Sequence, residues 1–492
     1  MRVIPKNWLI FAVFIYLLAA WSSVGHYHDD EYYQILDFTA LKLGFEMQNA
    51  VMWEYEAGVR SGLQPLIAFL VVKAMMSIDI TSPFLWAFCL RLISLMVSLV
   101  SIIVFIQAIK DQIKSDTIFR WTVFFLLYSW LFIFLNVRFS SESWALSLFI
   151  LAYGIYFSQD SLNDKKCFYV GLVLGFAFLA RYQMGFLLLG FVCWMLFQRH
   201  EKLRNLLIIV TGGVTALILG VAIDYWLYGT FTLSGWNYFE WHILKGSLDN
   251  IVHEPWWYYS YYSAVQLIPP ITLLLPIVVL IFWMLFPRHP ITWSVLPFVL
   301  FHHYFGHKEM RYLFPVLPFA PVMFAMVLEK LIYRFRFLET NKFIYPWKII
   351  IGVSVFLNTI LIVLVLTLPA SKEVALWQNC LSRNLSVDTS VLLVYDPDGS
   401  SSSTGELELD FYNKDNIPVI SVSNESEIAD KIIELPDKQL FYASRKKNRE
   451  KDLSAAEISH KLVCQALPNW LLKININDWT SRTSMWRIWS VK

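Results

Sequence analysis

The sequence predicts an all-α, multi-pass membrane protein that ends in a small α/β domain, and three observations carry this prediction. First, 57% of the 492 residues are hydrophobic and only 16% are charged, and the mean hydropathy is +0.51. Soluble domains carry about 25% charged residues, so most of this chain must use lipid as its solvent. Second, long apolar runs recur throughout residues 1–370. Third, residues 371–492 are polar and contain short β-like runs.

About eleven apolar runs are long enough, or nearly long enough, to cross a bilayer. They are residues 7–23, 84–108, 121–136, 143–157, 167–180, 184–198, 204–222, 266–286, 291–305, 312–333 and 346–369. The first run lacks a clear small-residue cleavage site, so we expect an uncleaved first span rather than a signal peptide. A further run, Leu66–Met76, is short and contains Lys73. This favours a re-entrant or interfacial helix.

Basic side chains in the short loops set the predicted orientation, because Lys and Arg are retained on the cytoplasmic side. Arg2 and Lys6 place the amino terminus inside, and the basic loops at 110–120, 165–166, 199–204, 288 and 334–342 then fall on the same side. The first polar loop (22–65), the long loop (223–262) and the tail from residue 371 are therefore predicted to face the lumen or periplasm.

The polar tail, residues 371–492, is predicted to form a separate α/β domain. Its β-like runs are Val391–Tyr395, Pro418–Val422, Gln439–Ala443 and Trp486–Val491, with a linker at residues 396–406. The five cysteines show no paired ligand spacing, so a sulfur-based metal site is not expected. Cys380 and Cys464 share the tail and can either pair in an oxidising compartment or remain free.

The first polar loop carries dense negative charge beside the membrane. Its motif HYHDDEYYQILD places Asp29, Asp30 and Glu31 directly after the first span. A positioned carboxylate there can take a proton from an acceptor hydroxyl, and neighbouring carboxylates raise one another's pKa. A solvated acidic loop without chemistry is the alternative. The H-x-H pair in the motif is weak evidence for a metal, and we expect no metal site.

Cationic side chains gather at span ends on the same predicted face. The motif GHKEMRYLFPVLPF brings together His307, Lys308 and Arg311. Charges at membrane depth are costly and mark sites, and on the non-cytoplasmic side such a group favours phosphate binding. Further cations that could bind phosphate, or only form ion pairs, are Arg60, Arg138 and Arg181.

The order and spacing of several motifs resemble glycosyltransferase family 22, the polyprenyl-phosphate-mannose-dependent α-mannosyltransferases, which include GPI mannosyltransferases. These motifs are HDDEYYQILD, WEYEAGVRS with QPLI, RFSSES, DYWLYG with HEPWWYY, and GHKEMRYLFPVLPF, within residues 1–335. Two positions depart from the family pattern: Asp29 replaces a proline and Phe139 a threonine. The resemblance implies an integral-membrane fold of the GT-C type. It also implies a donor of mannose, or a related sugar, on polyprenyl phosphate.

The resemblance further implies an inverting mechanism without a metal or other cofactor. Asp30, or Glu31 as second choice, would be the catalytic base, while His307, Lys308 and Arg311 hold the leaving phosphate. Candidates for contacts with the sugar or the acceptor are His28, Gln34, Trp53, Glu54, His253 and Trp256. We expect the base and the phosphate-binding cations to meet on one side of the bilayer.

The expected partners are the lipid-linked donor, a glycolipid or glycan acceptor, and membrane lipid. A formal charge of +2 without a basic tract excludes nucleic acid. A transporter or flippase, or a binding scaffold, are the competing classes. Charges at helix ends and the lack of an internal repeat favour the transferase. The compact chain without a retention ending favours a bacterial inner membrane over the endoplasmic reticulum.

Overall fold

The computed structural model describes the whole chain except residues 1–3, 49–51, 159–161, 246–252, 336–340, 387, 398–404, 447–448, 468 and 475–484. The chain divides into two compact units. The first contains Met1–Trp21, Glu54–Leu66 and Leu90–Thr367, and the second contains Ser22–Trp53, Ile67–Cys89 and Leu368–Lys492. The sequence-based division assigned all of residues 1–370 to the membrane domain. The structure instead groups most of the first polar loop with the tail.

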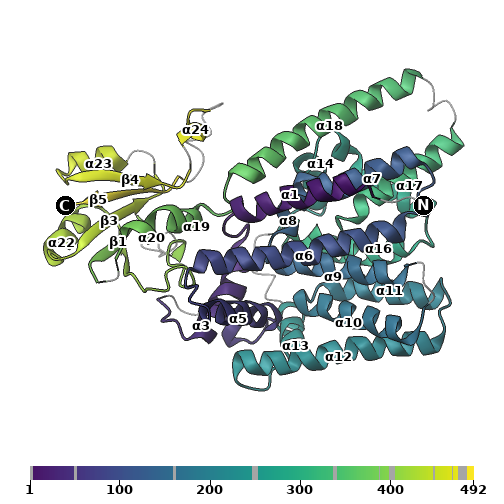
Figure 1. Ribbon diagram of the computed structural model, residues 1–492, viewed down its shortest axis with the longest axis horizontal. Helices are drawn as coiled ribbons and strands as arrows, with labels where there is room; N and C mark the ends of the chain where they lie inside the picture. Colours follow the sequence, from purple (N-terminus) through teal and green to yellow (C-terminus); the bar gives the residue numbers. More distant parts are fainter. Residues whose placement is uncertain are drawn as a thin grey trace. The chain divides into compact units, whose positions relative to one another are not determined.

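Apolar helices build the first unit, and each apolar run predicted above overlaps a helix or a bent pair of helices (Figure 1). They are α1 (Lys6–Ser22), α6 (Pro83–Ile109), α7 (Asp116–Tyr128), α8 (Trp130–Asn136), α9 (Ser141–Tyr156), α10 (Asp164–Ala180), α11 (Met184–Phe197), α12 (Leu203–Tyr228), α15 (Leu275–Leu285), α16 (Pro290–Tyr304), α17 (Phe319–Arg334) and α18 (Asn341–Thr367). Of these, α6 begins in the second unit. Shorter elements of the unit include α13 (Ser234–Phe239), the π-helix η2 (Glu240–Leu244), α14 (Tyr258–Gln266) and two 3-10 helices, η4 (Ile271–Leu274) and η5 (Met310–Val316).

The number of membrane crossings is a separate question from the number of helices. Within the described ranges, three helical stretches are long and apolar enough to cross: α6, α12 and Tyr345–Thr367 of α18. The number becomes five if α7 with α8, bent by 46°, and η5 with α17, bent by 62°, each count as one span. The predicted helices are therefore confirmed, while about eleven crossings stay a prediction. The short run at Leu66–Met76 forms most of helix α5 (Leu63–Met76).

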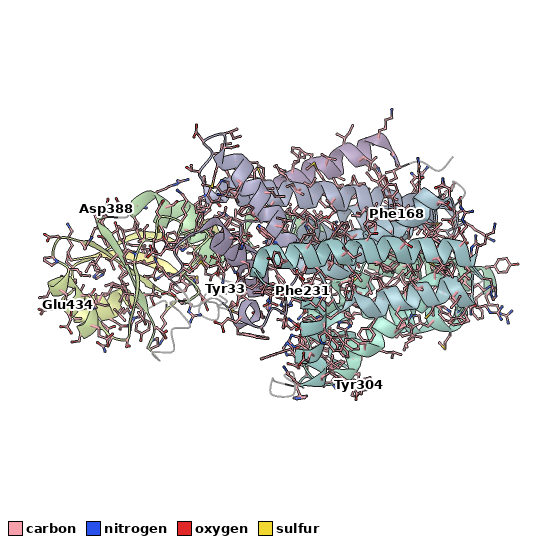
Figure 2. The ribbon with its side chains drawn as sticks, turned by 90° about the horizontal axis from the view of Figure 1, so that it is seen from below. Tyr33, Phe168, Phe231, Tyr304, Asp388 and Glu434 are labelled. Atoms are coloured by element: carbon pink, nitrogen blue, oxygen red, sulfur yellow. A yellow bond between two sulfur atoms is a disulfide. The ribbon has the colours of Figure 1, made fainter. Side chains whose placement is uncertain are left out.

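Small residues allow α10 and α12 to pack closely, as expected for apolar helices in lipid. A Cβ atom on Gly171 would overlap the carbonyl oxygen of Ile209, and one on Gly212 would overlap that of Phe168. Phe168 is labelled on α10 in Figure 2. On its other side α10 packs against α9. This arrangement brings the C-terminal end of α10, capped by Arg181, toward α9.

A five-stranded sheet forms the centre of the second unit, in the order β2-β1-β3-β5-β4. Its strands are β1 (Ser390–Tyr395), β2 (Val419–Val422), β3 (Gln439–Ser444), β4 (His460–Gln465) and β5 (Arg487–Val491). β1 pairs in parallel with β2 and β3, while β5 is antiparallel to β3 and β4. Four of the five strands match the predicted runs. The unpredicted β4 lies at the sheet edge and is half-exposed, so it lacks a clear apolar pattern.

Two helices cover one face of the sheet. Helices α22 (Glu425–Glu434) and α23 (Arg449–Ala455) bury Ile428 and Leu453 against a core that includes Trp489. A disulfide between Cys380 and Cys464, with 6.2 Å between the Cα atoms, ties the π-helix η7 (Trp377–Leu381) to β4. Of the two alternatives left open for these cysteines, the structure shows the paired one. The predicted linker at 396–406 and the basic loop at 334–342 lie largely outside the described residues.

The first polar loop adds three short helices to the second unit. These are α2 (Asp29–Glu31), the π-helix η1 (Tyr32–Asp37) and α3 (Phe38–Leu43). α3 ends at Gly44, whose φ of 81° is the left-handed conformation that favours glycine as a helix stop. The acidic motif thus lies on a continuous helical segment rather than on an extended loop.

Candidate active site

The segment from His307 to Tyr312 is held together by one carboxylate of its own. Glu309 Oε1 lies 2.9 Å from His307 Nε2 and accepts a hydrogen bond of 2.9 Å from the Tyr312 hydroxyl. Its other oxygen, Oε2, accepts a hydrogen bond of 2.5 Å from Arg311 Nε. Three side chains of the predicted cationic motif are therefore oriented by Glu309, which the sequence reasoning left without a role.

A second carboxylate, Glu142, joins this segment to two helices. Glu142 Oε1 accepts hydrogen bonds from Arg181 Nη1 at 2.5 Å and from Arg311 Nη1 at 3.1 Å. All three side chains are buried, and the Ser141 hydroxyl donates to Glu142 Oε2 at 3.0 Å. Glu142 lies in the first turn of α9, where a negative charge is favoured by the helix dipole. Two predicted phosphate-binding cations are thus brought together by a residue that the sequence reasoning missed.

Arg60 belongs to a neighbouring cluster in the same unit. Its Nη2 donates a hydrogen bond of 3.2 Å to Glu54 Oε1, and its guanidinium lies 5.6 Å from the centre of the Tyr238 ring. Tyr238 in turn lies 4.4 Å from the His242 ring. Burial, with the positive charges of Arg60 and His307, lowers the pKa of His242 to about 4. His242 is therefore neutral at physiological pH, although it lies among cations.

Lys308 has different contacts from Arg311. Its Nζ is directed at backbone carbonyl groups, donating to that of Glu254 at 3.2 Å and to that of Phe305. Burial lowers the pKa of Lys308, an effect opposed by the Glu254 carboxylate. Glu254 N also donates to the carbonyl of Gly306 at 2.8 Å. Lys308 thus anchors the end of the long loop against the cationic segment.

The segment around His253 approaches Gly306 so closely that no side chain fits there. A Cβ atom on Gly306 would overlap the His253 ring. Trp256, three residues further on, is 72% exposed and is available for a contact outside the protein. The predicted sugar contact His253, next in the chain to Glu254, therefore lies against Gly306, and the Glu254 carbonyl accepts a hydrogen bond from Lys308.

Arg138 lies in the turn between α8 and α9 and is fully buried. Its guanidinium packs 4.5 Å from the centre of the Phe134 ring, a cation-π contact. It is four residues before Glu142, but the contacts described above do not include it. Its predicted phosphate role remains a prediction.

The acidic motif lies in the second unit. His28 is the N-cap of α2, and its Nδ1 accepts a hydrogen bond from Asp30 N at 3.2 Å. Asp30 Oδ1 lies 3.6 Å from His28 Nδ1, and the Asp30 side chain is 26% exposed. A hydrogen bond from His26, with the charges of His26 and His28, lowers the pKa of Asp29 against the effect of burial. Asp30 is therefore held by its neighbour while remaining accessible.

The predicted site residues are divided between the two units. The first unit contains Arg60, Glu54, Arg138, Arg181, His253, Trp256, His307, Lys308 and Arg311. The second unit contains His28, Asp30, Glu31, Gln34 and Trp53. Within the first, the contacts group Arg181, His307 and Arg311, with Arg60 nearby. In the second, Gln34 is buried in η1, whereas Trp53 is exposed.

Glu142, which the sequence reasoning missed, could have been identified from the motif RFSSES. There a glutamate begins an apolar helix, and a charge in such a position marks a site.

No group of three or more His, Cys, Asp or Glu side chains in the described part of the chain is placed to hold a metal ion. Activity without a metal nevertheless stays a prediction.

Comparison with known proteins matches residues 7–376 to the Alg9-like mannosyltransferase family. GPI alpha-1,2-mannosyltransferase 3 of Danio rerio is 24% identical over 343 residues, which cover 67% of this chain and 61% of that protein. The Homo sapiens protein of that name is 26% identical over 321 residues, covering 64% of this chain and 56% of its own length. Mannosyltransferase APTG1 of Arabidopsis thaliana is 23% identical over 339 residues, with 64% and 57% covered. The chain spans about three fifths of the length of these relatives.

A solved structure shares the fold. ArnT from Cupriavidus metallidurans, bound to undecaprenyl phosphate, superposes with a TM-score of 0.59 at 12% identity, covering 98% of this chain and 97% of that one. This likeness supports the expected GT-C type of membrane fold, and the comparisons give the transporter alternative no support. The family match extends over most of the chain and includes both the acidic motif and the Glu142 and Glu309 cluster. The chain therefore belongs to the Alg9-like mannosyltransferase family.

Proposed function

We propose that this protein is an integral-membrane, inverting glycosyltransferase. It moves mannose, or a related sugar, from a polyprenyl-phosphate donor to a hydroxyl of a glycolipid or glycan acceptor on the lumenal or periplasmic face. The observation that carries the proposal is the family match over residues 7–376. Relatives named GPI alpha-1,2-mannosyltransferase 3 support mannose as the sugar. A fold neighbour bound to undecaprenyl phosphate supports a lipid-linked donor.

The proposed base is Asp30, with Glu31 as the second choice. Asp30 takes the proton of the acceptor hydroxyl, and the acceptor oxygen forms a bond to the anomeric carbon of the donor sugar. The bond from that carbon to the phosphate oxygen breaks, and its electron pair leaves with the lipid phosphate. Attack from the opposite face inverts the anomeric configuration. The partial exposure of Asp30 and its contact with His28 suit a carboxylate that must meet a substrate.

The proposed binding group for the leaving phosphate is built on Arg311, Arg181 and His307. Charge stabilisation is most effective when the cations are already oriented before the reaction, so that no reorganisation is needed. Glu142 and Glu309 supply that orientation by holding the two guanidinium groups and the imidazole. Lys308 would add charge at the edge of the same segment, close to the proposed sugar contacts.

The test is transfer by the purified full-length protein in detergent, with a panel of labelled polyprenyl-phosphate sugars that includes mannose. We expect consumption of the mannose donor, also in the presence of a chelator. Asp30→Asn should lower turnover by about 10²–10⁴-fold, the usual contribution of a general base, while donor binding remains. The matched control is Asp79→Asn, at an exposed acid of the same unit whose φ of 61° suits asparagine.

Each part of the proposal can fail separately. Transfer from none of the sugars would reject the transferase, and a strict need for a divalent metal would reject the metal-free mechanism. Full activity of both Asp30→Asn and Glu31→Gln would reject the assignment of the catalytic base to either residue. Single cysteines at Tyr27 and at Tyr304, which are 50% and 85% exposed, report sidedness with a membrane-impermeant thiol reagent. Labelling of the two positions from opposite sides would reject a shared site.

A further inference from the structure

The end of the predicted linker and the residues after it lie along the acidic segment of the first loop, within the second unit. We call Gly405–Tyr412 the tail strap. The Tyr33 hydroxyl donates a hydrogen bond of 2.9 Å to the carbonyl oxygen of Gly405. The Phe411 backbone N–H donates one of 3.0 Å to the Tyr32 hydroxyl oxygen. The two ends of the strap are therefore bonded to neighbouring residues that directly follow Asp30 and Glu31. Tyr33 is labelled in Figure 2.

Aromatic packing buries the same junction. The Tyr32 ring stacks on the Tyr412 ring, with 5.9 Å between centroids, and Tyr412 stacks on Phe84 at 5.4 Å. Phe411 meets Trp86 edge to face at 5.9 Å. Tyr32, Phe411, Tyr412 and Trp86 are all buried. Aromatic pairs of this kind stabilise a contact beyond the effect of burial alone, so the strap is a packed contact rather than a loose surface segment.

The helical geometry makes the orientation of Asp30 and Glu31 depend on the strap contacts. Tyr32 begins the π-helix η1, which follows α2 without a break, and its ring meets the Tyr33 ring edge to face at 5.0 Å. π-helical turns are rare and frequently occur at functional sites. Because α2 and η1 form one continuous helical segment, fixing Tyr32 and Tyr33 also fixes the direction in which Asp30 and Glu31 point.

The strap is itself bonded to the α/β domain and to the other end of the loop. Arg445 Nη1, next to β3, donates to Glu406 Oε1 at 2.6 Å, and the Trp377 indole N–H donates to the Leu407 carbonyl at 2.9 Å. Gln48 N donates to Asp410 Oδ1 at 3.2 Å. A connected set of contacts thus runs from the sheet through the strap to the acidic segment.

We propose that the tail strap is a positioning element of the candidate active site, through which the α/β domain holds the Asp29–Glu31 segment in its working orientation. Tyr32 and Tyr33 are positioning residues in this account, because they act through Asp30 or Glu31 and not on the substrate. The inference rests on the proposed function for the role of the acids. A displacement of about 1 Å can lower an enzyme's rate by about 100-fold, so loss of the strap contacts should reduce turnover without removing any catalytic group.

The first test follows amide hydrogen exchange in the full-length protein and does not depend on activity. Tyr32→Phe combined with Tyr33→Phe removes both hydroxyl groups and keeps the rings. We expect faster exchange in residues 28–37 and 405–412 together. Tyr442→Phe is the matched control, because it removes a hydroxyl that accepts a hydrogen bond of 3.0 Å from Arg449 Nε elsewhere in the same unit. Unchanged exchange in both segments of the double variant would overturn the proposal that the strap holds the acidic segment.

The second test measures the transfer reaction of the same variants per folded molecule. The double variant is expected to lose at least about tenfold in kcat while its KM for the donor stays within about twofold, since orientation of the base matters in the transition state. Tyr442→Phe should match the wild type in kcat. Equal kcat in the double variant and the control would overturn the positioning role. Absence of transfer by the wild type would instead reject the proposed function, while the exchange result still decides whether the strap holds the segment.

Discussion

Glu142 and Arg311 are 169 residues apart in the chain, yet Glu142 Oε1 accepts a hydrogen bond of 3.1 Å from Arg311 Nη1 in the buried part of the first unit. Arg181 Nη1 donates to the same oxygen at 2.5 Å. One carboxylate therefore holds two guanidinium groups that would otherwise repel each other. The free energy of this arrangement depends on all three charges being present, because a buried charge without its partner is costly.

Glu142→Gln should therefore destabilise the protein more than the loss of an ordinary ion pair. Removing one member of a buried ion pair costs about 3–5 kcal/mol. Glutamine keeps an oxygen that can accept a hydrogen bond, so we expect Glu142→Gln to lower the free energy of unfolding by about 3 kcal/mol or less. The measurement is the apparent Tm of the purified protein in detergent. Asp164→Asn is the control, because the Asp164–Arg204 pair is exposed and such pairs contribute about 0–1 kcal/mol. Equal Tm values for the two variants would show that Glu142 does not organise the cluster.

Arg311→Lys should impair the proposed reaction although it keeps the charge. The guanidinium of Arg311 donates from Nε to Glu309 and from Nη1 to Glu142, a fork that one ammonium group cannot reproduce. We expect a loss of about 10²-fold or more in kcat/KM, the usual effect of removing an oriented donor from a developing negative charge. Arg334→Lys, at an exposed position at the end of α17, is the matched control. Comparable activity of both variants would contradict the role of Arg311.

Gly306→Ala should displace the end of the long loop. The new methyl group would overlap the His253 ring, and the bond from Glu254 N to the Gly306 carbonyl limits how the segment can move away. We expect a higher KM for the donor, because Lys308 Nζ loses the Glu254 carbonyl as a partner. The control is Gly352→Ala in α18, where no atom lies within 4 Å of the new group. There the change should be neutral or stabilise the helix by up to about 1 kcal/mol.

Replacing Cys380 and Cys464 together by serine should destabilise the α/β domain. The disulfide closes a loop with a sequence separation of 84 residues. Loop-closure entropy then predicts a loss of about 4.5 kcal/mol in the free energy of unfolding. Thermal unfolding with and without a reductant measures this: the wild type should shift and the double serine variant should not. Replacing the buried free thiol Cys167 by serine is the control: this variant keeps the disulfide, so its thermal unfolding should shift with the reductant as that of the wild type does.

The Asp37 carboxyl predicts a pH dependence of stability in the second unit. Burial raises the pKa of Asp37 well above its usual range, and the nearby Asp410 charge acts in the same direction. A raised folded pKa gives stability that is complete below the unfolded value of about 4 and is lost as the pH rises through the folded value. The Tm of Asp37→Asn minus that of the wild type should therefore grow from low to high pH.

The control for this pH series is Asp388→Asn, at an exposed carboxylate of the same unit that is labelled in Figure 2. Its Tm difference from the wild type, measured over the same series, is the reference against which the Asp37→Asn series is compared. If Asp37→Asn behaved in the same way, the buried carboxyl would not be the titrating group. The measurement compares each variant with the wild type at the same pH, so that titration of other groups cancels.

Local sequence patterns were sufficient for the helices and most of the sheet. Each apolar run became a helix or a bent helix pair, because hydrophobicity over a long window is a local property that the bilayer selects. β1, β2, β3 and β5 followed from their alternating or buried apolar residues, whereas the half-exposed edge strand β4 did not. The sequence left open whether Cys380 and Cys464 form a disulfide, because their pairing depends on the distance between two elements of the tail.

Some features of the candidate site likewise follow from the sequence, and others only from the folded structure. The sequence by itself determined which side chains are the candidates for chemistry: the acids Asp30 and Glu31 after the first span, and the cations of the His307–Arg311 motif. Only the tertiary structure decided their partners, placing Arg181 and Arg311 on Glu142 and the tail strap on Tyr32 and Tyr33. The physical reason is that residue type and local pattern are written in short stretches of sequence. Ion pairs and packing between residues hundreds of positions apart arise only when the chain has folded.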